Sequence, residues 1–235
     1  MTALRQRTSA YLSMSTWHNA LTWGNELRMS SETRPANGDT RTFLGAIIRN
    51  PFELGAIAPS SKAVARLAAS VVPVTHGAVV VELGAGGGVI SDAIRERLPP
   101  GGRQLAVELN DDMVRHLRRS RPWLEVIADD AGDLEKLLGR AGVTRVDAII
   151  SSLPWTLFDE QRQKHILDGV SAALALGGRF STVITLSAMP SRRFRQFRGL
   201  LNRTFATVGT MGPVWLNVPP ALVFTASRSH SDLGE

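Results

Sequence analysis

Short apolar stretches alternate with amphipathic ones along most of this 235-residue chain, and this alternation restricts the fold more than any other feature. Stretches of strand length lie near residues 78–83, 104–108, 124–128, 146–151 and 179–185. Stretches with helical spacing lie near residues 61–70, 89–97, 111–119 and 159–175. Such alternation predicts an α/β fold, a mostly parallel sheet with helices on both faces. Two further strand-like runs, 205–208 and 221–226, leave no room for a crossover helix, so we expect seven strands with an antiparallel last strand.

Composition excludes several classes of protein and site. The chain has no Cys, so it can form no disulfide, no thiolate zinc site and no cysteine nucleophile. Its apolar runs have strand length, and none approaches the 18 or so residues of a membrane span. With 43% hydrophobic and 20% charged residues, the composition is that of an ordinary globular domain.

Positive charge is concentrated at the two ends of the chain. Residues 1–49 carry six Arg against three acidic residues, and residues 176–235 carry seven Arg against two. The middle, residues 50–175, carries 14 Lys or Arg against 16 acidic residues. Basic ends predict a polyanionic partner, either nucleic acid or an anionic membrane. Most of the cations are Arg, which pairs bidentately with phosphate, although codon bias in a GC-rich genome would also produce this excess.

The first 40 residues differ from the rest of the chain. Apolar residues recur there at near-helical spacing, and residues 30–39 then have the composition of a linker. We therefore expect a helical appendage with a linker over residues 1–40, followed by one domain over residues 41–230.

A glycine-rich turn follows the first predicted strand. The segment Val79–Leu83 leads into Gly84-Ala85-Gly86-Gly87-Gly88 and then into a predicted helix, a context in which glycines let the backbone approach a ligand closely. A dinucleotide fingerprint starting at Gly84 would need a small residue at position 89, where Val89 stands. A tight turn without a ligand is the alternative.

The spacing of this turn, Glu82-x-Gly84-x-Gly86-x-Gly88, resembles the first motif of class I S-adenosylmethionine-dependent methyltransferases. The resemblance implies that Glu82 lies near the methionine end of the cofactor. It also implies that Gly84, Gly86 and Gly88 admit the cofactor closely.

Acidic residues end the second and third predicted strands. Glu108 ends the second, where a carboxylate can accept hydrogen bonds from both hydroxyls of a ribose, so the ligand is expected to be a nucleoside. The third strand runs into Asp129-Asp130-Ala131. The methyltransferase resemblance implies that Asp130, followed by Ala131, contacts the adenine amino group, with Asp129 as the alternative.

The fourth predicted strand ends in Ser151-Ser152-Leu153-Pro154-Trp155, beside the expected cofactor. This segment resembles the acceptor motif of amino-group methyltransferases, in which a polar residue is followed by Pro and an aromatic residue. The resemblance implies that Ser152 accepts the N–H groups of the substrate and that Trp155 covers its nitrogen. It also implies that Ser151 contacts the cofactor and Pro154 the substrate. Packing of Trp155 in the core is the alternative.

Three blocks together are similar to the bacterial soluble phospholipid N-methyltransferases of the PmtA type. These are residues 43–61, FLGAIIRNPFELGAIAPSS, then Ser151–Pro154, and residues 217–224, NVPPALVF. The resemblance, over about residues 41–228, implies a Rossmann-like class I methyltransferase fold and S-adenosylmethionine as cofactor, with Ser60 and Ser61 among its contacts. It further implies stepwise methylation of phosphatidylethanolamine toward phosphatidylcholine by a cytoplasmic enzyme at the inner face of the membrane.

A basic stretch, residues 191–203, provides independent support for a membrane partner. Phe194, Phe197 and Leu201 fall on one helical face, and five Arg with no acidic residue surround them. Such a helix can lie in a membrane interface with its arginines on lipid phosphates. The arginines assigned to that contact are Arg192, Arg193 and Arg195. The alternative is a crossover helix that packs its Phe side chains on the sheet and exposes its Arg to water.

Two other functions compete with lipid methylation. An RNA adenine N-methyltransferase would use the same fold and basic ends, but no helical domain follows the last strand, so nucleic acid is the less favoured partner. A small-molecule amine methyltransferase is the other candidate. Transfer of a methyl group from a sulfonium to a neutral amine is an in-line displacement that needs positioning and no metal. His165, Asp159 and Glu160 follow the acceptor motif, but none is identifiable as the general base.

Overall fold

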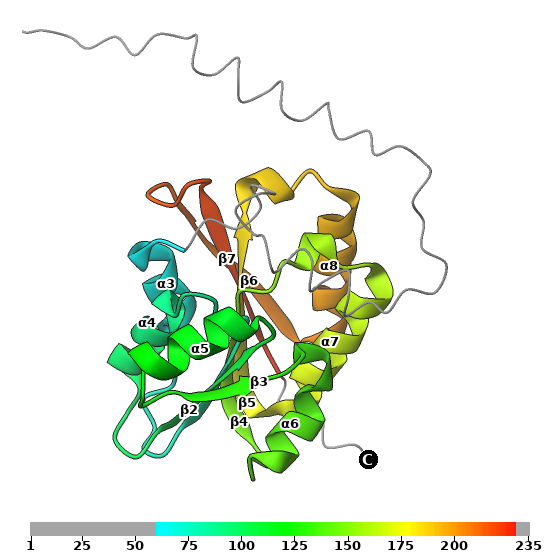
Figure 1. The fold of residues 1–235 in the computed structure, drawn as a ribbon. Helices are drawn as coiled ribbons and strands as arrows, with labels where there is room; N and C mark the ends of the chain where they lie inside the picture. The colour runs from blue at the N-terminus through cyan, green and yellow to red at the C-terminus, as the bar shows by residue number, and fades with distance from the viewer. Residues whose placement is uncertain (1–59, 229–235) are drawn as a thin grey trace, which may run out of the picture. The chain divides into compact units, whose positions relative to one another are not determined.

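The computed structural model describes residues 60–228, which form a seven-stranded sheet in the order β3-β2-β1-β4-β5-β7-β6 (Figure 1). The strands are β1 (Val79–Leu83), β2 (Arg103–Glu108), β3 (Glu125–Ala128), β4 (Val146–Ser151), β5 (Leu174–Thr185), β6 (Thr207–Val214) and β7 (Ala221–Ser227). The predicted appendage over residues 1–40 and the first part of the family block, residues 43–59, lie outside the described residues. The division into 1–40 and 41–230 stays a prediction.

The pairing of the strands confirms the predicted topology. Strands β1 to β5 run parallel to one another, whereas β7 is antiparallel to both β5 and β6. Strand order reverses between β1 and β4, because the chain moves outward through β2 and β3 and then returns to the other side of β1. In open parallel sheets this reversal, at the carboxyl ends of the strands, is where ligands bind.

Helices cover both faces of the sheet (Figure 1). On one side lie α3 (Lys62–Ala68), α4 (Val89–Arg97) and α5 (Asp111–Ser120), and on the other lie α6 (Leu134–Arg140), α7 (Glu160–Ala173) and α8 (Arg192–Thr204). Strand β4 therefore contributes to two cores. Ile149 packs toward α7 and α8, while Ala148 and Ile150 pack toward α3 and α4. Because β4 is covered on both faces, its central residues Ala148, Ile149 and Ile150 are apolar in succession instead of alternating.

Most of the long helices begin at a residue that caps them. The side chains of Asn110, Asp159 and Ser191 accept hydrogen bonds from backbone N–H groups in the first turns of α5, α7 and α8. These caps satisfy donors that a helix leaves unpaired at its amino end. Helix α4 differs, since it begins at Gly88 without a side-chain cap.

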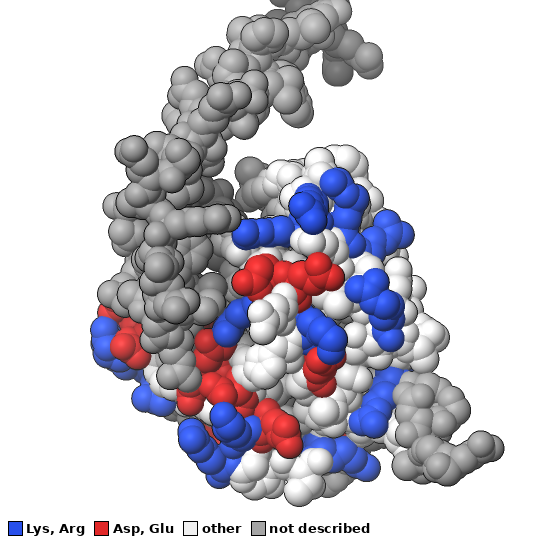
Figure 2. Space-filling view, turned by 90° about the vertical axis from the view of Figure 1, so that its right-hand side faces the viewer, with Lys and Arg blue, Asp and Glu red and all other residues white. Residues whose placement is uncertain are grey.

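Helix α8 packs on the sheet through its apolar face, as the crossover-helix alternative for residues 191–203 predicted. Phe194, Phe197, Leu200 and Leu201 are buried in the core beside β5 and β7, so the two Phe side chains are not available for insertion into a membrane. The arginines of α8 lie on its outer face, and blue side chains gather over the upper part of the surface in Figure 2. Within residues 60–228, no helix combines the length and the apolar character that a membrane span requires.

Candidate active site

The loops that follow β1 and β4 lie against each other at the carboxyl end of the sheet. The backbone N–H of Ser152 donates to the Leu83 carbonyl over 2.9 Å. Gly84 lies so close to the β4 loop that a Cβ atom there would sit 3.2 Å from Leu153 Cδ2. The fold therefore brings the glycine turn and the predicted acceptor motif together, as the sequence predicts.

Glu108 reaches from the end of β2 to the glycine turn. Its Oε2 accepts a hydrogen bond from the Gly86 N–H over 2.8 Å, and its Oε1 accepts one from the Asn110 N–H over 2.8 Å. Gly86 and Gly87 have open space beside them, because a Cβ atom added to either would meet nothing within 4 Å. A carboxylate next to unfilled space at the point where strand order reverses fits a bound nucleoside.

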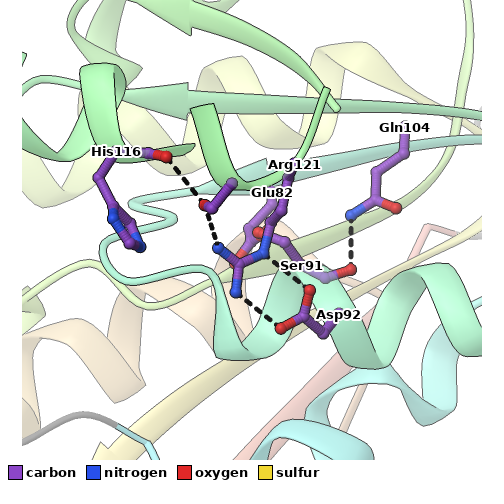
Figure 3. Close-up of polar contacts among 7 residues, drawn as sticks. Glu82, Ser91, Asp92, Gln104, His116 and Arg121 are labelled. Carbon is purple, nitrogen blue, oxygen red and sulfur yellow. Dashed lines mark hydrogen bonds and ion pairs between the residues drawn. The ribbon is translucent and has the colours of Figure 1, made fainter. Parts of the chain in front are cut away.

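Gly88 has a structural reason for being glycine, and its predicted contact with the cofactor stays a prediction. Its φ is +81°, and a Cβ atom there would fall 2.5 Å from the Arg121 Cζ. Both Asp92 oxygens hold the Arg121 guanidinium over 2.7 Å, and Figure 3 shows this pair beside Glu82. The space that Gly88 leaves is thus filled by an arginine, whereas the space beside Gly86 is open.

Replacing Gly88 by Ala should lower the free energy of unfolding by about 1–3 kcal/mol, because the new side chain meets a left-handed φ and displaces Arg121 from Asp92. Chemical denaturation would measure this loss. Gly87→Ala is the matched control, since Gly87 lacks a positive φ and has no atom within 4 Å of an added Cβ. Equal stability of the two variants would contradict the explanation.

Glu82 lies beneath the turn and is fully buried. Its Oε2 accepts a hydrogen bond from Ser91 Oγ over 2.5 Å, and its Oε1 has no hydrogen-bond partner among the described residues. Loss of hydration on burial raises the pKa of Glu82 from its usual 4.5 to about 8, against the opposing effect of the Ser91 hydrogen bond. The carboxyl group is therefore mostly protonated at neutral pH in this structure.

Asp130 is engaged by Arg162 of α7, which differs from its predicted role. Both oxygens of Asp130 contact Arg162 Nη2, and Oδ1 also accepts the Gly132 N–H over 2.7 Å. The side chain is almost fully buried, so this carboxylate is not open to an adenine amino group here. Asp129, the alternative, is more exposed and lies 3.6 Å from Arg140, while Ala131 packs in the core.

Trp155 is a core residue, so the prediction that its ring covers the acceptor nitrogen is wrong for this structure. Only 1% of its surface is exposed. Its ring stacks on Phe197 with centroids 4.6 Å apart, and its Nε1 donates to Thr182 Oγ1 over 2.8 Å. Edge contacts to Phe158 and Phe180 complete the enclosure.

The serines of the acceptor motif have different environments. Ser151 is fully buried, and its Oγ accepts the Leu153 N–H over 3.2 Å, which shapes the loop after β4. Ser152 and Pro154 are half-buried at the loop surface. Of the predicted acceptor residues, these two remain accessible from the carboxyl end of the sheet. Of the three candidate bases, Asp159 caps α7 and Glu160 accepts a hydrogen bond from Gln196, whereas His165 is exposed.

Two blocks of the family resemblance meet in space. The backbone N–H of Ser61 donates to Asn217 Oδ1 over 2.8 Å, although 156 positions separate them in the chain. Ser61 Oγ also caps α3, and Ser60 is half-buried beside it. The sequence places Asn217 in a block of the family resemblance but indicates no role for it. Arg121 and Arg162 could not be predicted as part of the site, since nothing in the sequence links either to its acidic partner.

No group of His, Asp or Glu side chains within residues 60–228 has an arrangement that could hold a metal ion. The assembled features are a glycine turn, a carboxylate beside open space and a Ser-Leu-Pro loop in contact with the turn.

Comparisons with known proteins agree with this geometry. No family model matches the chain. Over 158 residues it is 31% identical to the ornithine lipid N-methyltransferase of Singulisphaera acidiphila, an alignment that covers 66% of this chain and 82% of that protein. The chain belongs to this methyltransferase family.

Solved structures show the same fold for this methyltransferase. A TehB-like S-adenosylmethionine-dependent methyltransferase from Corynebacterium glutamicum superposes with a TM-score of 0.55 at 17% identity, covering 81% of this chain and 98% of that one. Aeropyrum pernix fibrillarin, solved with bound S-adenosylmethionine, superposes with a TM-score of 0.53 at 21% identity, covering 70% and 74%. The fold is the Rossmann-like class I methyltransferase fold, and the cofactor is S-adenosylmethionine.

Proposed function

We propose that this methyltransferase transfers methyl groups to the primary amine of a membrane lipid headgroup. The observation that carries the proposal is the contact between the Ser-Leu-Pro loop and the glycine turn, in a chain whose relative is named for N-methylation of a lipid. That name suggests ornithine lipid, whereas the sequence resemblance suggests phosphatidylethanolamine. Both lipids offer a primary amine on an acyl-chain anchor, so either fits the same loop.

The loop after β4 is proposed to orient the amine. Ser152 is half-buried at the strand end, where its hydroxyl oxygen can accept an N–H of the substrate, and Pro154 would bound the same site. S-adenosylmethionine would supply a methyl group on its sulfonium: attack of the amine lone pair on the methyl carbon would form the N–C bond, break the C–S bond and release S-adenosylhomocysteine. The chain's contribution is then to hold an uncharged amine in line with that group, because such a displacement depends mainly on position and on exclusion of water.

The cofactor is proposed to lie along the glycine turn. Glu108 would accept the ribose hydroxyls while it keeps its bond to the Gly86 N–H, since a carboxylate offers about four lone-pair directions. The open space beside Gly86 and Gly87 would receive the adjoining part of the cofactor. Ser60 and Ser61 would close the site from the start of α3.

Methyl transfer to purified lipids tests the proposal. Vesicles containing phosphatidylethanolamine or ornithine lipid, with S-adenosylmethionine carrying a labelled methyl group, should yield methylated lipid that mass spectrometry identifies. Structured RNA, free ethanolamine and free ornithine should remain unlabelled. Label on RNA or on a free amine, with none on lipid, would overturn the proposal and favour one of the competing functions.

Replacing Glu108 by Ala should weaken binding of S-adenosylmethionine about tenfold or more, because hydrogen bonds to a charged group are lost. Isothermal titration calorimetry would measure the change. Glu125→Ala is the matched control, since Glu125 lies on the neighbouring strand and pairs with Arg103 at the surface. Unchanged affinity in a folded Glu108→Ala protein would remove Glu108 from the cofactor site.

A further inference from the structure

The turn between β6 and β7 presents three large apolar side chains to solvent. Trp215 is 69% exposed, Leu216 is 82% exposed and Val218 is 79% exposed. We call residues 215–218 the hairpin tip. Among residues 60–228 only three other large apolar side chains are exposed, and they are scattered in the sequence at Val74, Trp123 and Leu176. Clustered exposed apolar residues mark interaction sites, whereas isolated ones do not.

The hairpin tip is held in place by the one residue in it that points inward. Asn217 is 4% exposed. Its Oδ1 accepts the Ser61 N–H over 2.8 Å, and its Nδ2 donates to the Pro219 carbonyl over 2.7 Å. The apolar side chains on either side of Asn217 are therefore presented outward by an anchored turn.

The hairpin tip lies at the same end of the sheet as the candidate active site. Strand β7 begins at Ala221, which pairs with Thr185 at the carboxyl end of β5, and β5 runs parallel to β4. The Leu186 N–H donates to the Pro220 carbonyl over 2.8 Å, which joins the tip to the segment after β5. Figure 1 shows both turns at one end of the sheet. The acceptor loop after β4 opens toward the same end.

The part of the chain that contains the hairpin tip is rich in arginine and has no acidic residue, and Glu160 of α7 is the acidic side chain that lies beside Arg192 and Arg195. Between Gly169 and Arg228 the chain has seven Arg and no Asp or Glu. Three of these arginines, Arg192, Arg193 and Arg195, are exposed in the first turn of α8, which starts just after the segment that bonds Pro220. An apolar tip and an arginine-rich surface at the same end of the sheet match the layered chemistry of an anionic bilayer, whose phosphates lie outside its acyl chains.

We infer that the hairpin tip inserts into the interfacial layer of an anionic phospholipid bilayer while the arginines at the start of α8 contact lipid phosphates. This contact directs the carboxyl end of the sheet toward the headgroups, so that a lipid amine reaches the loop after β4 without leaving the membrane. Trp suits this position, because its ring is favoured at the headgroup level. The inference rests on the proposed lipid substrate and specifies how that substrate is reached.

Vesicle sedimentation with a triple variant tests the inference. Trp215→Ser, Leu216→Ser and Val218→Ser together should weaken binding to vesicles of phosphatidylglycerol and phosphatidylcholine at least tenfold. All three side chains are exposed, so thermal unfolding and S-adenosylmethionine affinity should match the wild type. Val74→Ser is the matched control, because Val74 is 87% exposed but precedes β1 at the opposite end of the sheet. Binding of the triple variant at the wild-type level would overturn the inference.

Tryptophan fluorescence gives a second test, which does not depend on a variant losing its binding to vesicles. Brominated phospholipids should quench the tryptophan fluorescence of the wild-type protein. Trp215→Phe should remove a large part of that quenching while the variant still sediments with vesicles. Quenching that is the same in both proteins would place Trp215 outside the bilayer. A wild-type dimer that the triple variant converts to a monomer would assign the tip to a second copy of the chain and would also overturn the inference.

A monomeric short-chain lipid substrate separates this inference from the proposed function. The triple variant should methylate that lipid at the wild-type rate but lose activity at least tenfold on vesicles. Wild-type protein that methylates no lipid in either form would refute the proposed function itself. Equal activity of both proteins on vesicles would refute only the role of the hairpin tip.

Discussion

Replacing Trp155 by Ala is expected to lower the free energy of unfolding by about 3–5 kcal/mol, the cost of removing a large buried aromatic side chain. The ring fills the space between α8 and β5, where it stacks on Phe197 and meets Phe180 edge-on. Its loss would also leave the buried Thr182 hydroxyl without its indole donor. Chemical denaturation of the purified variant would measure the change.

A conservative variant separates packing from catalysis at this position. Trp155→Phe keeps an aromatic ring against Phe197 but removes the N–H that donates to Thr182, so about 1–2 kcal/mol should be lost and methyl transfer retained. Trp123→Ala is the control, since Trp123 is a partly exposed tryptophan outside the core. Loss of methyl transfer in a stable Trp155→Phe protein would indicate that the Trp155 ring is part of the acceptor site.

The stability of the cofactor-free protein should fall as the pH rises from about 4.5 to 8, and Glu82→Gln should remove much of this dependence. Burial raises the pKa of Glu82 to about 8, so the folded state retains a proton that the unfolded chain releases above its usual pKa. The contribution of Glu82 to the free energy of unfolding is therefore fully present at acidic pH and is lost as the pH approaches 8. The slope contributed by one such group is at most about 1.4 kcal/mol per pH unit.

Unfolding measured at several pH values would test this expectation. At pH near 5 the wild type and Glu82→Gln should be similar in stability, because an amide can replace a protonated carboxyl group beside Ser91. Above pH 8 the variant should be the more stable by several kcal/mol. Glu125→Gln, at an exposed carboxylate, should leave the wild-type slope unchanged. A wild-type slope in Glu82→Gln would show that Glu82 is ionised in the folded protein.

Local patterns were sufficient to predict most of the elements that position the site. The predicted helix at 89–97 and strand at 146–151 have the observed bounds, because a glycine turn precedes the helix and the apolar residues 148–150 lie at the centre of the strand. The short helix α6 was missed, since its seven residues hold too few turns to establish a period. Strand β5 begins at Leu174, earlier than predicted, because the Gly177-Gly178 pair resembles a break and is accommodated by an irregular register with β4.

Side-chain direction was the part that the sequence could not provide. An aromatic residue after Ser-Leu-Pro has the same appearance whether its ring faces a substrate or the core, and only the position of α8 decides this for Trp155. The pairing of Asp130 with Arg162 and of Gly88 with Arg121 depends on residues 32 and 33 positions away. Such pairs arise from tertiary packing, which no local pattern encodes.

The place of β7 in the sheet has a consequence for biosynthesis. This strand is the last of the described fold to leave the ribosome, yet it lies between β5 and β6 and contributes the end of the sheet at which Asn217 bonds Ser61. Until it is made, β5 and β6 each lack a neighbour and expose unpaired backbone groups that invite association between nascent chains. The nascent chain must therefore stay soluble while its sheet is incomplete, and a product truncated before residue 221 should aggregate instead of forming a partial enzyme.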